Sequence, residues 1–101
     1  MYDAFEPVGY VYILASTRAG TLYIGATSDL IKRVYQHREG ITKSFTSRHK
    51  VHRLVYYEQY ASIEEAIKRE KQLKGWNRAW KIRLIEKTNP KWDDLFLQLA
   101  R

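Results

Sequence analysis

One carboxylate stands where a helix pattern leads us to expect an apolar side chain. Glu70 lies three residues after Ile67 and three before Leu73, and about 100° per residue places it inside their apolar stripe. A lone buried carboxylate is costly unless it is paired or binds a metal ion. The sequence leaves two interpretations open: a functional group, or a structural acid that pairs with Arg69 or Lys74 or reaches water at an edge.

Two basic side chains earlier in the chain are spaced for one helix face. Arg33 and His37 are four residues apart, and Leu30 shares that face, so the pair borders the predicted apolar stripe. A planar guanidinium binds phosphate oxygens in a bidentate way, so an arginine beside a histidine suits a phosphate-binding wall. The alternative is a solvated basic face, which is the simpler explanation for His37 taken alone.

Two tyrosines, Tyr12 and Tyr23, occupy similar apolar runs on either side of a predicted turn at residues 17–20. Phenols can transfer protons or hold a phosphate by hydrogen bonding. Tyrosine is also favoured in strands, and this chain holds eight of them. Spacing alone therefore favours a place in the core for both phenols.

Three strands are expected to position these side chains. Tyr10–Ser16 and Thr21–Ala26 predict a β-hairpin, and its two apolar faces indicate a central place in the sheet. The run "RLVYYEQY" at residues 53–60 predicts a third strand. The polar, Ser/Thr-rich and basic segment at 40–50 predicts a loop.

Three helix patterns complete an α+β domain of order β-β-α-β-α-α that spans residues 1–101. A short amphipathic tail follows them. The predicted starts and stops are Ser28 or Asp29 with Gly40, a capping box of Ser62 and Glu65 with Gly75, and Asn77 with Asn89-Pro90. The predicted apolar stripe of the first helix is Leu30, Ile31, Val34 and Tyr35.

The composition limits the classes of function. Eighteen Lys and Arg stand against eleven Asp and Glu, a net charge of +7, which favours a polyanionic partner over a merely soluble basic surface. The chain has no cysteine, which excludes disulfides, thiolate metal sites and a cysteine nucleophile. No apolar run is long enough to span a membrane, and the opening "MYDAFEP" lacks the basic start of a secretory signal. We therefore expect a soluble cytoplasmic protein.

Several of these features occur together and in a characteristic order. "YVY" at 10–12, "YIG" at 23–25, the helix residues Arg33 and Glu70, and Asn89-Pro90 resemble the GIY-YIG nuclease superfamily, in particular its small stand-alone bacterial members. The resemblance covers about residues 10–95 and implies a three-stranded antiparallel sheet flanked by helices. In one departure, Tyr10 replaces the first glycine, although Gly9 is adjacent. This substitution narrows access to the backbone at the strand start and leaves Tyr12 in place.

The resemblance implies a metal-assisted hydrolysis of a phosphodiester. Glu70 would be the sole protein ligand of one divalent ion, Mg²⁺ or Mn²⁺, which keeps most of its waters. Tyr12 would take a proton from the attacking water, once neighbouring positive charge has lowered its pKa from about 10. Tyr23 would hold the water or phosphate, and Arg33 would neutralise charge on the phosphoryl oxygens. The implied catalytic set is Tyr12, Tyr23, Arg33, His37, Glu70 and Asn89, with Asn89 in a positioning role and Gly25 as the glycine of the second motif.

The expected partner is nucleic acid, DNA rather than RNA, with room for a protein partner that selects the substrate. Trp76 and Trp80 could offer an aromatic surface to a splayed base, although core packing is the simpler role for at least one of them. Two rival functions stay open: a nucleic-acid-binding module that does not cut, and a basic structural protein. The basic residues expected to contact nucleic acid are Lys32, Arg38, Lys43, Arg48, His49, Lys71, Lys74 and Arg78.

Overall fold

A computed structural model describes residues 8–40 and 50–99 of the chain. Its sheet has three antiparallel strands in the order β2-β1-β3, which confirms the predicted α+β class. The first strand is central and the second is an edge strand, so only half of the hairpin is central. The strands are β1 (Gly9–Ala15), β2 (Leu22–Thr27) and β3 (Arg53–Tyr60).

The helices begin where capping side chains satisfy their free backbone N–H groups. Asp29 accepts a hydrogen bond from the Lys32 N–H, Ser62 from that of Glu65, and Asn77 from that of Trp80. The predicted caps of all three helices are therefore confirmed. The helices are α1 (Leu30–Arg38), α3 (Ile63–Lys74), α4 (Arg78–Thr88) and the short α5 (Phe96–Leu99).

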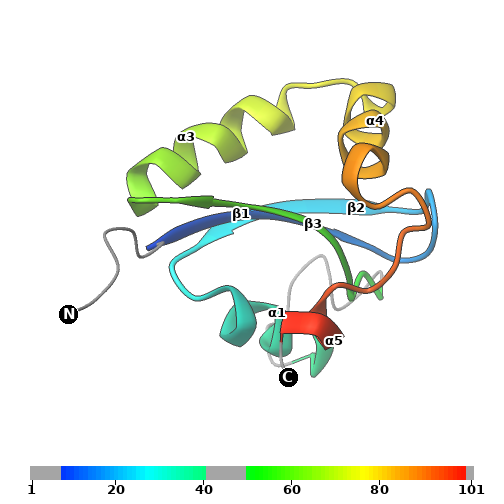
Figure 1. Cartoon of the computed structure of the whole chain (residues 1–101), viewed down its shortest axis with the longest axis horizontal. Coiled ribbons are helices and arrows are strands. Elements are labelled where there is room, and N and C mark those ends of the chain that lie inside the picture. The colour runs from blue at the N-terminus through cyan, green and yellow to red at the C-terminus, as the bar shows by residue number, and fades with distance from the viewer. Residues whose placement is uncertain (1–7, 41–49, 100–101) are drawn as a thin grey trace.

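The helices cover both faces of the sheet, as Figure 1 shows, with α3 and α4 on one face and α1 and α5 on the other. Alternation along β1 divides the core accordingly. Val11 and Ile13 are buried under α3 and α4, whereas Tyr12 and Leu14 belong to the cluster on the α1 side. No helix among the described residues is long and apolar enough to cross a membrane.

The buried face of α1 differs from the predicted stripe. Ile31 and Tyr35 are 45% and 50% exposed, so their predicted burial is wrong. The buried residues are Leu30, Val34 and His37, which follow one another at intervals of four and three. A helix that lies on a sheet buries only this narrow strip. His37 is therefore part of the core.

Candidate active site

The centre of the candidate site is a hydrogen bond between two buried side chains. Tyr12 projects from the central strand and is 1% exposed, and His37 on α1 is fully buried. The Tyr12 hydroxyl oxygen lies 3.1 Å from His37 Nε2. His37 is therefore not on a solvated basic face, and Tyr12 is a core residue whose polar end meets an imidazole.

A glycine on the neighbouring strand makes room for the Tyr12 hydroxyl. Gly25 stands opposite Tyr12 in the β1–β2 register. A Cβ added at Gly25 would lie 2.5 Å from the Tyr12 hydroxyl oxygen, closer than any side chain tolerates. The glycine of "YIG" is therefore required by the phenol of the first motif.

The second tyrosine completes a group of three rings. Tyr23, on edge strand β2, is half-buried beside Leu14 of the central strand. Its ring centroid lies 6.3 Å from that of Tyr12 and 5.3 Å from that of His37. Two segments far apart in the sequence thus place two phenols and an imidazole together.

Arg33 brings a positive charge to both phenols. Hydrogen bonding with Tyr12, and further interactions with Tyr23, raise the pKa of the Arg33 guanidinium. Because a guanidinium can only donate, the Tyr12 oxygen accepts from it, and the single Tyr12 proton is left to point at His37. His37 Nε2 is then the acceptor, which requires the proton of the neutral ring to be on Nδ1.

The pKa values of Tyr12 and His37 agree with a hydrogen bond in which Tyr12 donates to His37. Burial, followed by the charges of Arg33 and His52, lowers the pKa of His37 to about 4, so the ring is neutral at pH 7. Burial raises the pKa of Tyr12 to about 12, although Arg33 acts in the opposite direction. Arg33 therefore lowers the Tyr12 pKa as expected, but burial outweighs it, and the activation of Tyr12 by further positive charge stays a prediction.

Glu70 lies on α3, which packs against β1 and β2. Its side chain is 18% exposed, and its charge is close enough to raise the pKa of Tyr12. Glu70 Oε2 forms an ion pair with the Lys74 ammonium at 2.9 Å, so the pairing with Lys74 that the sequence left open does occur. The Lys74 side chain is 55% exposed, and such pairs contribute less than about 1 kcal/mol.

The donors near Glu70 fit one hydrated divalent ion and no richer metal site. Within residues 8–40 and 50–99, no three His, Cys, Asp or Glu side chains are grouped to hold a metal. Mg²⁺ and Mn²⁺ accept one carboxylate together with water and substrate oxygens, and Mg²⁺ in particular retains several waters. Such an ion would replace the exposed Lys74 ammonium on Glu70.

Asn89 is buried at the end of α4 and makes its hydrogen bonds to backbone groups. It is 5% exposed, and its Nδ2 donates to the carbonyl oxygens of Val55 and Asp93 while its Oδ1 accepts from the Asp93 N–H. These bonds tie the end of α4 to β3. Asn89 therefore positions the backbone, and its place in the catalytic set stays a prediction.

The basic residues expected at nucleic acid divide into three groups. Lys32, Lys71 and Lys74 are exposed on α1 and α3. Arg38 instead bonds to Asp94 at 2.5 Å, and Arg78 bonds to the carbonyl oxygens of the β1–β2 turn, so both guanidinium groups hold the fold together. The other three expected contacts, Lys43, Arg48 and His49, lie outside the described residues.

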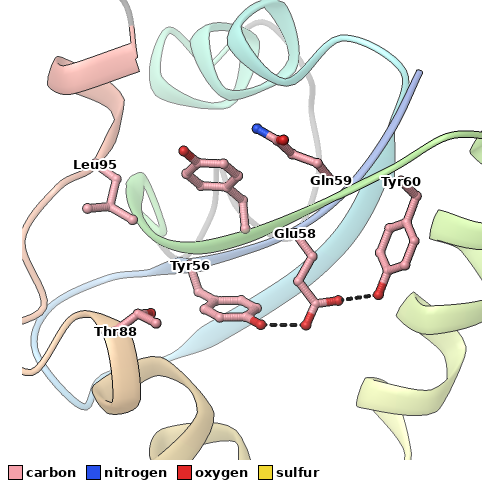
Figure 2. A pocket seen from close by; sticks show the side chains of 7 residues that line it. Tyr56, Glu58, Gln59, Tyr60, Thr88 and Leu95 are labelled. Carbon is pink, nitrogen blue, oxygen red and sulfur yellow. Dashed lines mark hydrogen bonds between the residues drawn. The ribbon is translucent and has the colours of Figure 1, made fainter. Parts of the chain in front are cut away.

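Two features were not found from the sequence. His52 lies close enough to His37 to lower its pKa, and its Nδ1 is buried with no hydrogen-bond partner among the described residues. Glu58 forms a second acid–tyrosine cluster on the α3 side of the sheet. In Figure 2 its carboxylate lies between the hydroxyls of Tyr56 and Tyr60, which both donate to it. Alternation along β3 puts these three side chains on one face, which could have indicated the cluster.

The comparisons with known proteins agree with this geometry. The family described as the GIY-YIG catalytic domain matches residues 8–83. The chain belongs to the GIY-YIG family. A relative from Staphylococcus saprophyticus, UPF0213 protein SSP2268, is 36% identical over 76 residues, which cover 75% of this chain and 92% of the relative. A UPF0213 protein from Staphylococcus aureus strain Mu3 is 38% identical over 77 residues, 76% of this chain and 93% of the relative.

A solved structure extends the likeness of this GIY-YIG domain to the fold. The solution structure of UPF0213 protein BH0048 from Bacillus halodurans is similar, with a TM-score of 0.53 and 30% sequence identity. It covers 85% of this chain, and the match spans 90% of that structure. GIY-YIG domains form a nuclease family that generally uses a divalent metal, which is the context for the residues around Tyr12.

Proposed function

We propose that this GIY-YIG domain is a divalent-metal-dependent endonuclease that hydrolyses phosphodiester bonds in DNA, including branched or damaged DNA of repair or recombination. The observation that carries the proposal is convergence: the Glu70 charge acts on the Tyr12 phenol, which already meets Arg33 and His37. On this proposal, the acid on α3 and the three groups around the Tyr12 phenol act on one phosphodiester.

Glu70 would hold the divalent ion, which when bound supplies Lewis-acid stabilisation of the scissile phosphate and the departing oxygen. Arg33 is placed to donate to phosphoryl oxygens, which it can do by leaving the phenols. Tyr23, half-buried beside the pair, would orient the attacking water or the phosphate by a hydrogen bond. Lys32 and Lys71, both exposed, would contact the DNA backbone.

A proton relay removes the need for a phenolate in the resting protein. As the attacking water gives a proton to the Tyr12 oxygen, the Tyr12 proton passes to His37 Nε2, so the phenol stays neutral throughout. The Arg33 charge is one cause of the low His37 pKa, after burial. A phosphate bound at Arg33 would offset that charge and make the imidazole a better base. His37 is thus proposed as the proton acceptor.

The rival function is a nucleic-acid-binding module that does not cut. The specific observation in its favour is that Glu70 is already paired with Lys74 while the Tyr12 pKa is raised. On that hypothesis, DNA binding falls with salt and is unchanged in Glu70→Ala, and no cleavage occurs. The weakness of an exposed pair makes us favour the nuclease.

The test is a cleavage panel of labelled linear, nicked, flapped and four-way DNA, together with RNA, in Mn²⁺ or Mg²⁺. The proposal predicts cleavage of at least one DNA substrate by the wild-type protein and none by Glu70→Ala. Glu64→Ala is the matched control, because Glu64 is an exposed acid of the same helix. Intact substrates throughout the panel with wild-type protein would overturn the proposal in favour of the binding module.

A further inference from the structure

A groove lies on the solvent side of α4, away from the phenols and the imidazole. It has a volume of about 540 Å³ and is lined by Trp76, Trp80, Arg83, Leu84 and Lys87. The last four follow one another at intervals of three, one and three, so they share one helix face. Ile85 lies in the hydrophobic core, and the partly buried Ile82 packs against it. The groove is therefore built from two indoles, one aliphatic side chain and two cations.

The two indoles are held in different ways. Trp76 packs against the core cluster, and the Arg69 guanidinium lies 5.1 Å from its ring centroid. Glu58 fixes Arg69 in turn, with Nε to Oε1 at 3.0 Å. Trp80 meets Trp76 edge to face at 5.8 Å, yet it is 49% exposed. One indole thus packs against the core, and the other is half-exposed to solvent.

The surroundings of the groove are strongly positive. Residues 68–87 carry eight Lys and Arg but only two acids, Glu70 and Glu86. Glu86 accepts a hydrogen bond from the Trp92 indole at 2.7 Å, and Glu70 is paired with Lys74. Among residues 8–40 and 50–99, no carboxylate lines the groove itself. An occupant with negative charge and a flat apolar part complements this surface.

We propose that this groove binds an unpaired base of a nucleic-acid strand, which stacks on Trp80 while Arg83 and Lys87 contact the flanking phosphates. Every base has a flat face, so stacking on tryptophan is tolerant of sequence, and nearby cations follow the backbone. In a protein segment, by contrast, acidic and aromatic side chains would both have to be present at a matching spacing. In a nucleic acid, each nucleotide carries both a negative phosphate and a flat base.

The position of the groove links it to the candidate active site. Glu70, Lys74 and Trp76 follow one another around the end of α3. The start of α4 is fixed to the β1–β2 turn, because Arg78 bonds to the carbonyl oxygens of Ala19 and Gly20 at 2.5 and 2.6 Å. If the proposed nuclease function holds, on which this step rests, the substrate has a single-stranded segment beside the cleaved bond, as in a flap or a gap.

The test measures binding and keeps cleavage separate. In a Glu70→Gln background, anisotropy follows a labelled oligothymidylate, the same strand with abasic sugars, and an acidic poly-glutamate peptide. We expect Trp80→Ala to weaken oligothymidylate binding about tenfold. Trp80→Phe should restore most of the affinity, and the abasic strand should be bound equally by all variants. The control is Tyr35→Ala, which removes another half-exposed aromatic side chain, on α1.

Equal losses for the normal and abasic strands, or a loss as large in Tyr35→Ala, would overturn the stacking site. If Trp80→Ala weakened binding of the acidic peptide but not of oligothymidylate, that result would also overturn the stacking site, in favour of a protein partner. Circular dichroism and the melting temperature confirm that Trp80→Ala folds. Wild-type protein that stacks bases through Trp80 but cleaves no DNA would refute the nuclease and leave the groove standing, whereas cleavage with no Trp80 effect would do the reverse.

Discussion

Two clusters of tyrosine, acid and arginine have their phenols on opposite faces of the sheet, and they differ in how their polar groups are satisfied. In the Glu58 cluster, the carboxylate accepts hydrogen bonds from two phenols and from Arg69. In the Tyr12 cluster, the phenol meets a neutral imidazole, and the acid, Glu70, has an exposed lysine as its partner.

The titration of Glu58 follows from its contacts. Burial raises the pKa of Glu58, but its bonds to Arg69 and the phenols outweigh burial and lower it overall. Burial and the bond to Glu58 raise the pKa of Tyr60 to about 12, so the phenol remains a donor. Every group there already has its partner, which is typical of a structural network. The Tyr12 cluster retains a neutral base and a weakly held carboxylate, which is what a site for substrate and metal needs.

The largest expected effect separates the two acids by activity. Glu70→Gln should lower the rate of DNA cleavage at least about a thousandfold, since a Lewis acid contributes several kcal/mol to such a reaction. The melting temperature should hardly change, because the lost ion pair is exposed on the lysine side. Initial rates in Mn²⁺ measure the first effect and thermal melting the second. A residual rate within tenfold of the wild type would remove Glu70 from the site.

The second effect is on stability and falls on the other cluster. Glu58→Ala removes the acceptor of two phenols and the carboxylate partner of the Arg69 guanidinium, which keeps Gln72 as an acceptor, so the free energy of unfolding should fall by about 3 kcal/mol. Urea denaturation checks this value, with exposed Glu64→Ala expected within about 0.5 kcal/mol of the wild type. Cleavage per folded molecule should persist. Equal stability losses in the two variants would make Glu58 an ordinary surface acid.

The third effect is a pH dependence that belongs to the Tyr12 cluster. The pKa of His37 is about 4 in the folded protein and 6.5 in the unfolded chain, so below pH 6.5 the unfolded chain takes up a proton first. Stability should therefore be constant above about pH 7 and fall by about 3 kcal/mol as the pH drops from 6.5 to 4. Urea midpoints at several pH values measure the loss.

His37→Gln keeps a hydrogen-bonding group and cannot titrate, so it should flatten the curve in that window. The lowered pKa of Glu58 gives stability that is fully present above about pH 4.5 and is lost only below it, as the carboxylate is protonated. The two contributions are thus separated by pH. An unchanged slope between 6.5 and 4 in His37→Gln would show that the imidazole is not buried in neutral form.

The smallest expected effect concerns Lys74, the lysine that is paired with Glu70. Lys74→Met removes a competitor of the metal, and an exposed pair contributes under about 1 kcal/mol. The Mn²⁺ concentration for half-maximal cleavage should therefore fall about two- to fivefold. Lys68→Met is the matched control, since Lys68 is exposed on the same helix and makes no ion pair among the described contacts. A higher Mn²⁺ requirement in Lys74→Met would mean that the lysine supports metal binding.

Local patterns were enough to predict the elements of this fold. A capping box at Ser62, the cap at Asn77 and the alternating run at 53–60 are short-range signals, and each marks an element in the structure. The ordered motifs around Tyr12 and Tyr23 also indicated the family correctly. These signals depend on neighbours within a few residues, so one sequence contains them.

What the sequence did not show depends on contacts between distant segments. The burial of His37 follows from how α1 lies on the sheet, and its bond to Tyr12 spans 25 residues. Arg38 was expected at nucleic acid, but its partner Asp94 lies 56 residues away. The sequence raised the pairing of Glu70 with Lys74 as an alternative and could not choose, because a spacing of four residues permits the pair without requiring it.

The most direct test of convergence is a Mn²⁺ titration of the isotope-labelled protein followed by NMR. Paramagnetic broadening falls steeply with distance, so at substoichiometric Mn²⁺ the ring signals of Tyr12 and Tyr23 should broaden before those of Tyr56 and Tyr60. Glu70→Ala should abolish this difference. Earlier broadening of Tyr56 and Tyr60, or an unchanged pattern in Glu70→Ala, would contradict a shared site for the acid and the phenols.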